Sequence, residues 1–323
     1  MEQDLFLNKS AVMGGGLMGS QITLVLALGS RETALMSRRQ ETLDGAMANI
    51  HRYAGDLERH DLLRGETAEA VLGRIRTTTE VEDAVVDAEF VVESITENLE
   101  AKQALFEQMD AIAPRQTVLA SNTSGLPITT LGARMVHQDR IGGSHFVQPG
   151  HIVPVVEVIR GQKTSDEAMD RSCEVWERLG RITLRVHKDG PGFLVNRLQH
   201  AVIREAVHLL VTGVADAEAI DQAIELGLAP RFTTAGPLKQ RDINGLKMHV
   251  RVAEHLWKEL GSWEEPLAYL QAMVARGETG LDSGKGYYDW SGQDPTAVRS
   301  EKDEQLIRRT EQVMTDWYAK AKR

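Results

Sequence analysis

Three residues in the middle of the chain, Ser124, His145 and Glu157, are of the types that a proton transfer to or from a substrate oxygen requires. A histidine exchanges protons near neutral pH, a hydroxyl binds a substrate oxygen, and a carboxylate orients the imidazole. Each also has a structural interpretation, as a helix cap, a hydrogen-bonded buried histidine, and a glutamate paired with an arginine. Glu157 is the strongest of the three, because it interrupts the apolar run VPVVEVI, where an unpaired carboxylate is costly to bury.

Strand-like segments flank or contain these three residues. The segments are 117–121 before the serine turn, 140–146 around the histidine, and 153–159 around the glutamate. If the three segments pair in one sheet, the polar side chains at their edges come together. The sequence therefore predicts a Ser–His–Glu cluster.

A glycine-rich turn near the start of the chain predicts a dinucleotide site. Residues 10–13 form a short apolar segment typical of a strand, GGGLMG follows at 14–19, and a helical pattern comes next. In this context Gly14 allows a tight turn, Gly16 lets the backbone approach a pyrophosphate, and Gly19 lets helix and strand pack closely. The pyrophosphate would lie on the helix N-terminus. A purely structural glycine turn is the alternative.

The end of the next predicted strand, 33–36, indicates which dinucleotide binds. NAD sites usually place Asp or Glu there to accept the ribose hydroxyls, but this chain has Ser37 followed by Arg38 and Arg39. A carboxylate would repel a 2′-phosphate, whereas a hydroxyl and two guanidinium groups would bind one. These residues therefore favour NADP, unless the arginines simply begin a solvated helix.

The order of the predicted elements gives the fold class. Strands and helices alternate up to about residue 188, which predicts an α/β fold with a Rossmann-type, doubly wound parallel sheet. A turn follows in HKDGPGFLVNRL, and the segments beyond it have helical patterns, including a long one at 236–261. We expect a dinucleotide-binding Rossmann domain at 1–188 and an all-helical domain at 189–323.

The composition narrows the class of protein. A net charge of −10 without a basic tract argues against general nucleic-acid binding. No apolar run approaches the roughly 20 residues that span a bilayer, and the N-terminal residues lack a signal-peptide pattern. The single cysteine, Cys173, excludes an intramolecular disulfide and fits a reducing cytoplasm. No His, Cys or Asp cluster has metal-ligand spacing. We therefore expect a cytoplasmic protein with no metal, no membrane partner and a small-molecule substrate.

Several motifs together resemble the 3-hydroxyacyl-CoA dehydrogenase family over nearly the whole chain. They are GGGLMGS, VVESITENLEAKQALF, ASNTSGLPIT, HF-x-x-P-x(5)-VVEVI, DGPGFLVNRL, GPLKQRDINGL and GLDSGKGYYDW. The resemblance implies a Rossmann domain that carries NAD and a helical C-terminal domain that closes the cleft and forms a homodimer. It also implies a role in fatty acid metabolism, on acyl-CoA substrates.

The resemblance implies roles for individual residues. His145 would be the general base that removes the proton of the substrate's 3-hydroxyl as hydride leaves C3 for C4 of the nicotinamide, and Glu157 would orient the imidazole. Ser124 and Asn196 would bind substrate oxygens, unless Asn196 is an ordinary exposed helix residue. The residues expected along the cofactor are Gly14, Gly16, Leu17, Met18, Gly19, Ser37, Arg38, Glu97, Lys102, Asn122, Ser124 and Gln148.

Three departures from the family pattern bear on cofactor and substrate. Ser37 replaces the acidic residue typical of NAD sites, and Gln148 replaces an asparagine three residues after the histidine. Pro154 stands where the CoA-ester enzymes tend to have a lysine. This variant is similar to relatives that act on free hydroxy acids, sugar acids, carnitine or a pyridine carboxylate. A CoA ester remains the first interpretation, and a small free acid the second.

A third interpretation comes from another class of protein: a catalytically idle cofactor-binding or structural protein, a role that crystallin-type relatives show can occur. Ser124, His145, Glu157 and Asn196 are all present. A structural role requires none of them together, so this combination favours an enzyme.

Overall fold

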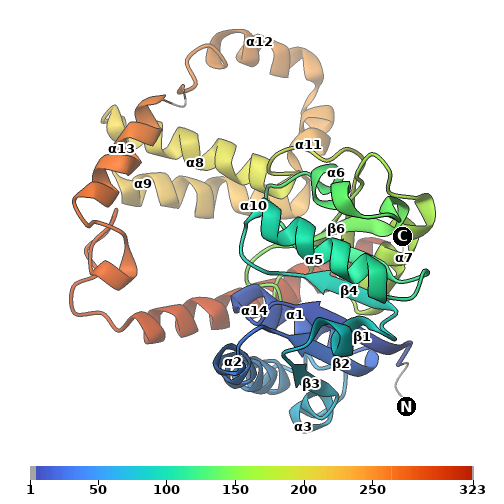
Figure 1. Ribbon diagram of the computed structural model, residues 1–323. Helices are drawn as coiled ribbons and strands as arrows, with labels where there is room; N and C mark the ends of the chain where they lie inside the picture. The colour runs from blue at the N-terminus through green and yellow to red at the C-terminus, as the bar shows by residue number, and fades with distance from the viewer. Residues whose placement is uncertain (1–4, 263, 322–323) are drawn as a thin grey trace. The chain divides into compact units, whose positions relative to one another are not determined.

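The chain divides into two compact units, residues 1–196 and 197–323. The computed structural model describes residues 5–262 and 264–321 (Figure 1). The first unit is built on a sheet and the second on helices. The division falls shortly after the predicted boundary between residues 188 and 189.

One eight-stranded sheet forms the centre of the first unit, in the order β3-β2-β1-β4-β5-β6-β7-β8. The strands are β1 (Leu7–Met13), β2 (Ser30–Met36), β3 (Ile75–Thr78), β4 (Phe90–Glu93), β5 (Val118–Ser121), β6 (Ile141–Phe146), β7 (Val155–Ile159) and β8 (Ile182–Val186). Strands β1 to β6 run parallel, and the order reverses between β1 and β4. Ligands of open α/β sheets bind at the carboxyl ends of the strands beside such a switch point.

The sheet is mostly parallel, as a doubly wound fold requires, and the predicted parallel arrangement fails only at β7, which runs antiparallel to β6. Residues 147–154 join the two strands, and a parallel connection needs a crossover of a dozen or more residues. The short return therefore sets β7 against β6. Strand β8 is again parallel to β7.

Helices cover both faces of the sheet, because its strands are apolar on both sides (Figure 1). The helices of this unit are α1 (Leu17–Ala27), α2 (Gln40–Arg59), α3 (Ala68–Leu72), α4 (Val81–Val85), α5 (Leu99–Ile112), α6 (Ile128–Leu131) and α7 (Asp166–Arg178). Helices α1, α2 and α7 share one buried cluster with Val12, and α4, α5 and α6 share the other with Met13. Adjacent residues of β1 thus point to opposite faces.

The second unit consists mainly of helices, as predicted. They are α8 (Val195–Val211), which begins in the last residues of the first unit, α9 (Ala217–Gln222), a π-helical turn (Ala223–Leu228), α10 (Ala229–Thr234), α11 (Pro237–Asn244), α12 (Leu246–Leu256), α13 (Glu264–Ala275) and α14 (Pro295–Ala321). The predicted long segment at 236–261 is interrupted at Gly245, whose φ of 91° lies outside the helical region. In the described part of the chain, no helix is long and apolar enough to cross a membrane.

Candidate functional site

His145 and Glu157 form a buried pair on neighbouring strands. The antiparallel register of β6 and β7 sets the two residues directly opposite each other, and His145 Nδ1 lies 2.7 Å from Glu157 Oε2. His145 is 4% exposed and Glu157 is fully buried. The predicted contact is therefore present, and it leaves the Nε2 atom as the imidazole's other proton-exchange position.

The second oxygen of Glu157 is also occupied. Oε1 accepts hydrogen bonds from the backbone N–H groups of Leu194, at 2.8 Å, and Val195, at 2.9 Å. Burial works to raise the pKa of this carboxyl group, but the hydrogen bonds from His145 and from the two N–H groups outweigh it, so the pKa lies below its usual value. Glu157 is thus held as an anion beside the imidazole.

Phe193 belongs to this site, although the sequence reasoning did not single it out. Its ring centroid lies 5.7 Å from that of His145, and the residue is 5% exposed. Its φ of 46° lies in the left-handed region, which is uncommon for a residue with a Cβ. No sequence pattern marks a phenylalanine for that conformation; the neighbouring glycines are the available signal.

Asn196 contacts the turn that carries Ser124, while a contact between Ser124 and His145 stays a prediction. Asn196 Nδ2 donates to the backbone carbonyl of Ser124 at 3.3 Å, and the Ser124 side chain is exposed. Ser124 lies between the end of β5 and α6, which begins at Ile128, so it does not cap that helix. Its hydroxyl remains available to a ligand.

Glu97 holds the turn that carries Ser124. Its Oε1 accepts hydrogen bonds from the backbone N–H groups of Ser124 and Gly125, both at 3.2 Å, and from the Thr123 hydroxyl. Burial alone would raise the pKa of Glu97, but the Thr123 hydrogen bond and the charge of Lys102 lower it overall.

Lys102 is buried and forms ion pairs with both Glu93 and Glu97. Its ammonium is 2.6 Å from Glu93 Oε1 and 3.2 Å from Glu97 Oε2, and its side chain is 1% exposed. Glu93 also accepts from the Ser121 hydroxyl and from the backbone N–H of Ile95. Burial raises the pKa of Glu93, and Lys102 acts against that rise. Lys102 therefore supports Glu97, and direct contact with a cofactor stays a prediction.

Asn122 connects β5 to the histidine strand. Its Oδ1 accepts from the backbone N–H of Phe146, next to His145, at 2.9 Å, and its Nδ2 lies 3.2 Å from Ser94 Oγ. Asn122 thus fixes the end of β6 from the neighbouring strand. The sequence reasoning did not single out Glu93 and Phe146, because their apolar surroundings resemble those of ordinary strand residues.

The glycine turn fits a dinucleotide pyrophosphate. Gly14 has a φ of 122°, and a Cβ on it would lie 2.5 Å from the carbonyl oxygen of Ser94. A Cβ on Gly19 would lie 1.8 Å from the Gly14 carbonyl oxygen, whereas one on Gly16 would meet nothing within 4 Å. Helix α1 has no side-chain cap and no acidic residue in its first turn. Its N–H groups and the open space at Gly16 therefore suit an anion.

The other residues expected along the cofactor lie at the same edge of the sheet. Ser37 and Arg38 follow β2, Leu17 and Met18 begin α1, and Gln148 follows β6. Carboxyl ends of parallel strands meet at one edge, so these positions surround the switch point. Contact of these residues with a cofactor stays a prediction.

The arginines after β2 are exposed. The guanidinium groups of Arg38 and Arg39 make no hydrogen bond or ion pair with another described residue, and Ser37 is half-buried. Helix α2 begins at Gln40, after both arginines. They are therefore free to meet a ligand.

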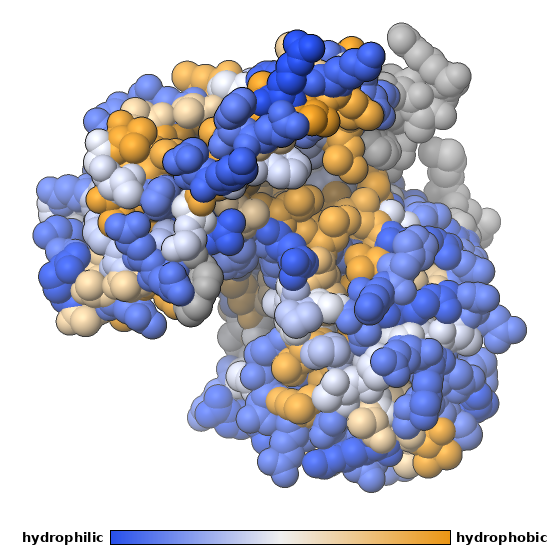
Figure 2. All heavy atoms as spheres, turned by 90° about the horizontal axis from the view of Figure 1, so that it is seen from above, coloured by the Kyte–Doolittle hydropathy of each residue, from blue (hydrophilic) through white to orange (hydrophobic). Residues whose placement is uncertain are grey.

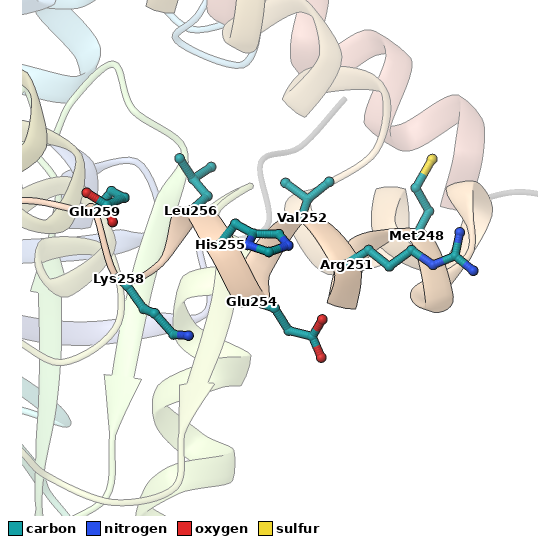
Figure 3. A pocket seen from close by; sticks show the side chains of 8 residues that line it. All are labelled: Met248, Arg251, Val252, Glu254, His255, Leu256, Lys258 and Glu259. Carbon is teal, nitrogen blue, oxygen red and sulfur yellow. The ribbon is translucent and has the colours of Figure 1, made fainter.

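A surface hollow elsewhere contains none of these residues. It has a volume of about 930 Å³, lies along α12, and is lined by Met248, Arg251, Val252, Glu254, His255, Leu256, Lys258 and Glu259 (Figure 3). Within the described residues, no group of three or more His, Cys, Asp or Glu side chains could hold a metal ion.

A Rossmann-type sheet, a glycine turn at an uncapped helix N-terminus and a buried His–Glu pair define a dinucleotide-dependent oxidoreductase. The family models agree: the 3-hydroxyacyl-CoA dehydrogenase NAD binding domain matches residues 9–190, and the C-terminal domain matches 192–290. The chain belongs to the 3-hydroxyacyl-CoA dehydrogenase family. It is an NAD(P)-dependent oxidoreductase that acts on CH–OH groups.

Individual relatives fall into two groups. A probable 3-hydroxybutyryl-CoA dehydrogenase of Deinococcus radiodurans is 37% identical over 87% of this chain and 100% of the relative. The 5-formyl-3-hydroxy-2-methylpyridine 4-carboxylate 5-dehydrogenase of Mesorhizobium japonicum is 29% identical over 92% of this chain and 95% of the relative.

Both groups also occur among the similar solved structures. A crystal structure of a 5-formyl-3-hydroxy-2-methylpyridine 4-carboxylic acid 5-dehydrogenase has a TM-score of 0.87 and 27% identity, covering 95% of this chain and 99% of that one. The (S)-3-hydroxybutyryl-CoA dehydrogenase of Ralstonia eutropha has a TM-score of 0.71 and 30% identity, covering 88% and 99%.

Proposed function

We propose that this protein interconverts an L-3-hydroxyacyl-CoA and its 3-oxoacyl-CoA, with His145 as the acid–base group. The observation that carries the proposal is the buried hydrogen bond between His145 Nδ1 and Glu157 Oε2. A general base needs a fixed orientation and a nearby charge that stabilises its protonated form. The 37% identity to a probable 3-hydroxybutyryl-CoA dehydrogenase supports the substrate class.

The cofactor and the residues of the site have separate roles in the proposed reaction. When bound, the nicotinamide supplies the hydride acceptor or donor. Nε2 of His145 takes the proton of the 3-hydroxyl in oxidation and returns it in reduction. Glu157, whose pKa is lowered, stabilises the imidazolium that forms. The exposed Ser124 hydroxyl and the Asn196 amide hold the substrate oxygens.

We propose on the basis of this substrate class that the protein acts in fatty acid metabolism. Acyl-CoA oxidation and synthesis both pass through 3-hydroxyacyl thioesters. A cytoplasmic location accords with the single cysteine, since reducing compartments disfavour disulfides.

We infer that NADP is the preferred cofactor. A 2′-phosphate needs cations and a hydroxyl instead of a carboxylate at the end of β2. Ser37 stands at that position, and the exposed guanidinium group of Arg38 follows it. Equilibrium titration with NADH and NADPH tests this inference, and tighter binding of NADH would contradict it.

A small free acid is the second candidate substrate. Pro154 stands before β7 where CoA-ester enzymes tend to have a lysine. The TM-score of 0.87 to the pyridine-carboxylate dehydrogenase exceeds the 0.71 to the 3-hydroxybutyryl-CoA dehydrogenase. The pyridine-carboxylate dehydrogenase structure matches 95% of this chain, so the match includes residues beyond 290, where the family model ends.

Steady-state turnover separates the two substrate classes. The better cofactor is used with acetoacetyl-CoA, and then with hydroxy acids, sugar acids and pyridine carboxylates. We expect acetoacetyl-CoA to give a kcat of about 1–10³ per second, the ordinary range for enzymes. Tight cofactor binding with turnover of a free acid alone would replace the CoA ester by that acid.

We also propose that the protein is a homodimer through its C-terminal domain. Exposed apolar side chains stand among hydrophilic ones on the surface (Figure 2), and many belong to α11 and α12, including Leu238, Ile243, Met248 and Val252. Val252 and Leu256 point to the same side of α12, away from Glu254 and Lys258 (Figure 3). Such a one-sided stripe is typical of a helix that packs against a partner.

Light scattering tests the dimer. Ile243→Lys places a charge within 236–250 and should shift the mass from dimer to monomer, whereas Lys247→Gln on the neighbouring helix serves as the control. A monomeric wild-type protein at micromolar concentration would contradict the proposal.

A further inference from the structure

The turn before α8 contains a strained phenylalanine. Gly192 and Phe193 both have positive φ values, 76° and 46°. Glycine adopts this region freely, but a residue with a Cβ does so at a cost in free energy. A glycine at position 193 would remove the strain, so the phenylalanine side chain must contribute something that outweighs it.

The backbone of this turn forms an anion-binding nest for Glu157. Because Gly192 and Phe193 turn the chain, the next two N–H groups, those of Leu194 and Val195, point at the same atom, Glu157 Oε1, at 2.8 and 2.9 Å. Successive N–H groups that converge in this way bind anions well. Here the anion is a side chain of the same molecule.

Glu157 therefore joins two parts of the site. Its Oε2 meets His145 Nδ1 at 2.7 Å, and its Oε1 fixes the first turn of α8. Asn196 follows Val195 directly, and its amide reaches the Ser124 carbonyl. The conformation at Phe193 thus determines where both the acid–base group and a substrate-binding amide lie.

The Phe193 ring lies beside the pair that this turn supports. It is 5% exposed, with its centroid 5.7 Å from that of the imidazole, in one apolar cluster with Ile128 and Ile159. A ring in this place keeps water from the buried hydrogen bond, which is stronger where the local dielectric is low.

We propose that Phe193 is a positioning residue: its left-handed backbone aims two N–H groups at Glu157, and Glu157 in turn fixes His145 and Asn196. This inference rests on the proposed acid–base role of His145. It assigns no contact between Phe193 and the substrate.

Two variants at position 193 separate backbone conformation from packing. Phe193→Gly loses the ring but keeps the left-handed conformation without strain. Phe193→Val keeps more apolar atoms, yet a β-branched residue strongly disfavours that conformation. We expect kcat/KM of F193V to be at least about tenfold below that of F193G, because small misplacements of reacting groups are costly. A role in packing alone predicts the opposite order.

The free protein provides a readout that needs no substrate. Long-range ¹H–¹⁵N spectra report which imidazole nitrogen carries the proton, and the His145 signals are assigned by their loss in His145→Gln. Wild type and F193G should show a proton on Nδ1, directed at Glu157, whereas F193V should show a mixture of tautomers. If no CoA ester is turned over, this result still decides the role of Phe193.

Two further variants control for effects of misfolding. Phe106→Val removes a buried phenylalanine from the same apolar cluster and should leave the His145 tautomer unchanged. If F193V does not fold, Phe193→Ala repeats the contrast with a smaller side chain, and F193A should fall below F193G. Equal kcat/KM and equal tautomers in F193G and F193V, or in F193G and F193A, would overturn the proposal.

Discussion

The two ends of the candidate site are built differently. At the His145–Glu157 end, the imidazole Nδ1 and both carboxylate oxygens have hydrogen-bond partners, and both residues are buried. At the end of β2, the Arg38 and Arg39 side chains are exposed and make no hydrogen bond or ion pair with a described residue. The His145–Glu157 end is therefore held in place by hydrogen bonds within the protein. The Arg38–Arg39 end has exposed side chains that a ligand can bind.

This difference indicates which property each end controls. Groups held in a dry, fixed geometry contribute to the rate of the chemical step. Exposed guanidinium groups pay an entropic cost when they bind, so they contribute affinity and selectivity between similar ligands. Changes at the first end should therefore lower kcat, and changes at the second should alter cofactor binding.

The largest expected effect comes from the acid–base group. His145→Gln should lower kcat by about 10²–10⁴-fold, the usual contribution of a general base, with little change in the Kd for the cofactor. Steady-state kinetics and cofactor titration measure the two quantities. His51→Gln, an exposed histidine on α2, is the control. Unchanged turnover would remove His145 from the mechanism.

The next effect concerns stability at the buried network. Lys102→Met leaves Glu93 buried without its cation and should lower the free energy of unfolding by about 3–5 kcal/mol. An unpaired buried carboxylate has a raised pKa, so the deficit should shrink at acid pH, where Glu93 is protonated. Urea unfolding at several pH values measures it.

Two further variants sharpen the result at Lys102. Lys163→Met, at an exposed position, should have little effect. Adding Glu93→Gln to Lys102→Met should recover part of the loss, because it removes the unpaired charge. If K102M is as stable as wild type, the network does not hold the Ser124 turn in place.

Cofactor selectivity should change at the exposed end. Ser37→Asp combined with Arg38→Leu removes charge-assisted hydrogen bonds worth about 1.5–3 kcal/mol, so the Kd for NADPH should rise by about 10–100-fold. The Kd for NADH should fall or stay constant. Arg31→Leu, at the opposite end of β2, is the control. Equal changes for both cofactors would refute the 2′-phosphate assignment.

The smallest effect is the pH dependence of stability that Glu157 contributes. Its pKa is lowered in the folded protein. The ionised form therefore adds stability that is present above the unfolded-state pKa, about 4.3, and is lost as the pH falls through the folded-state value. The gap in unfolding free energy between wild type and Glu157→Gln should be widest near neutral pH and narrow below about pH 4. A gap that stays constant would contradict this assignment.

The sequence was sufficient for the fold class and for the central pair. Apolar segments around His145 and Glu157 predicted two strands, and the strand–glycine–helix order predicted the dinucleotide unit, because periodicity and turn residues carry this information. The direction of β7 was not predicted correctly. The length of the 147–154 connection was the signal that could have corrected it.

The residues that hold the site in place through hydrogen bonds and backbone conformation could not be predicted in the same way. Glu93 and Ser121 end strands that resemble ordinary buried ones, and their partners lie far away in sequence. The left-handed conformation of Phe193 depends on tertiary contacts, since intrinsic preference argues against it. Long-range hydrogen bonds and strained backbone are therefore the information that a single sequence did not provide.

The central claim, that His145 exchanges the substrate proton, is tested most directly by the pH dependence of hydride transfer. Single-turnover rates of NADPH consumption with acetoacetyl-CoA are measured from pH 5 to 10 for wild type and His145→Gln. We predict that the wild-type rate depends on pH and that this dependence is absent from the slower variant. The same pH-dependent limb in both proteins would contradict the claim and assign proton transfer to another group.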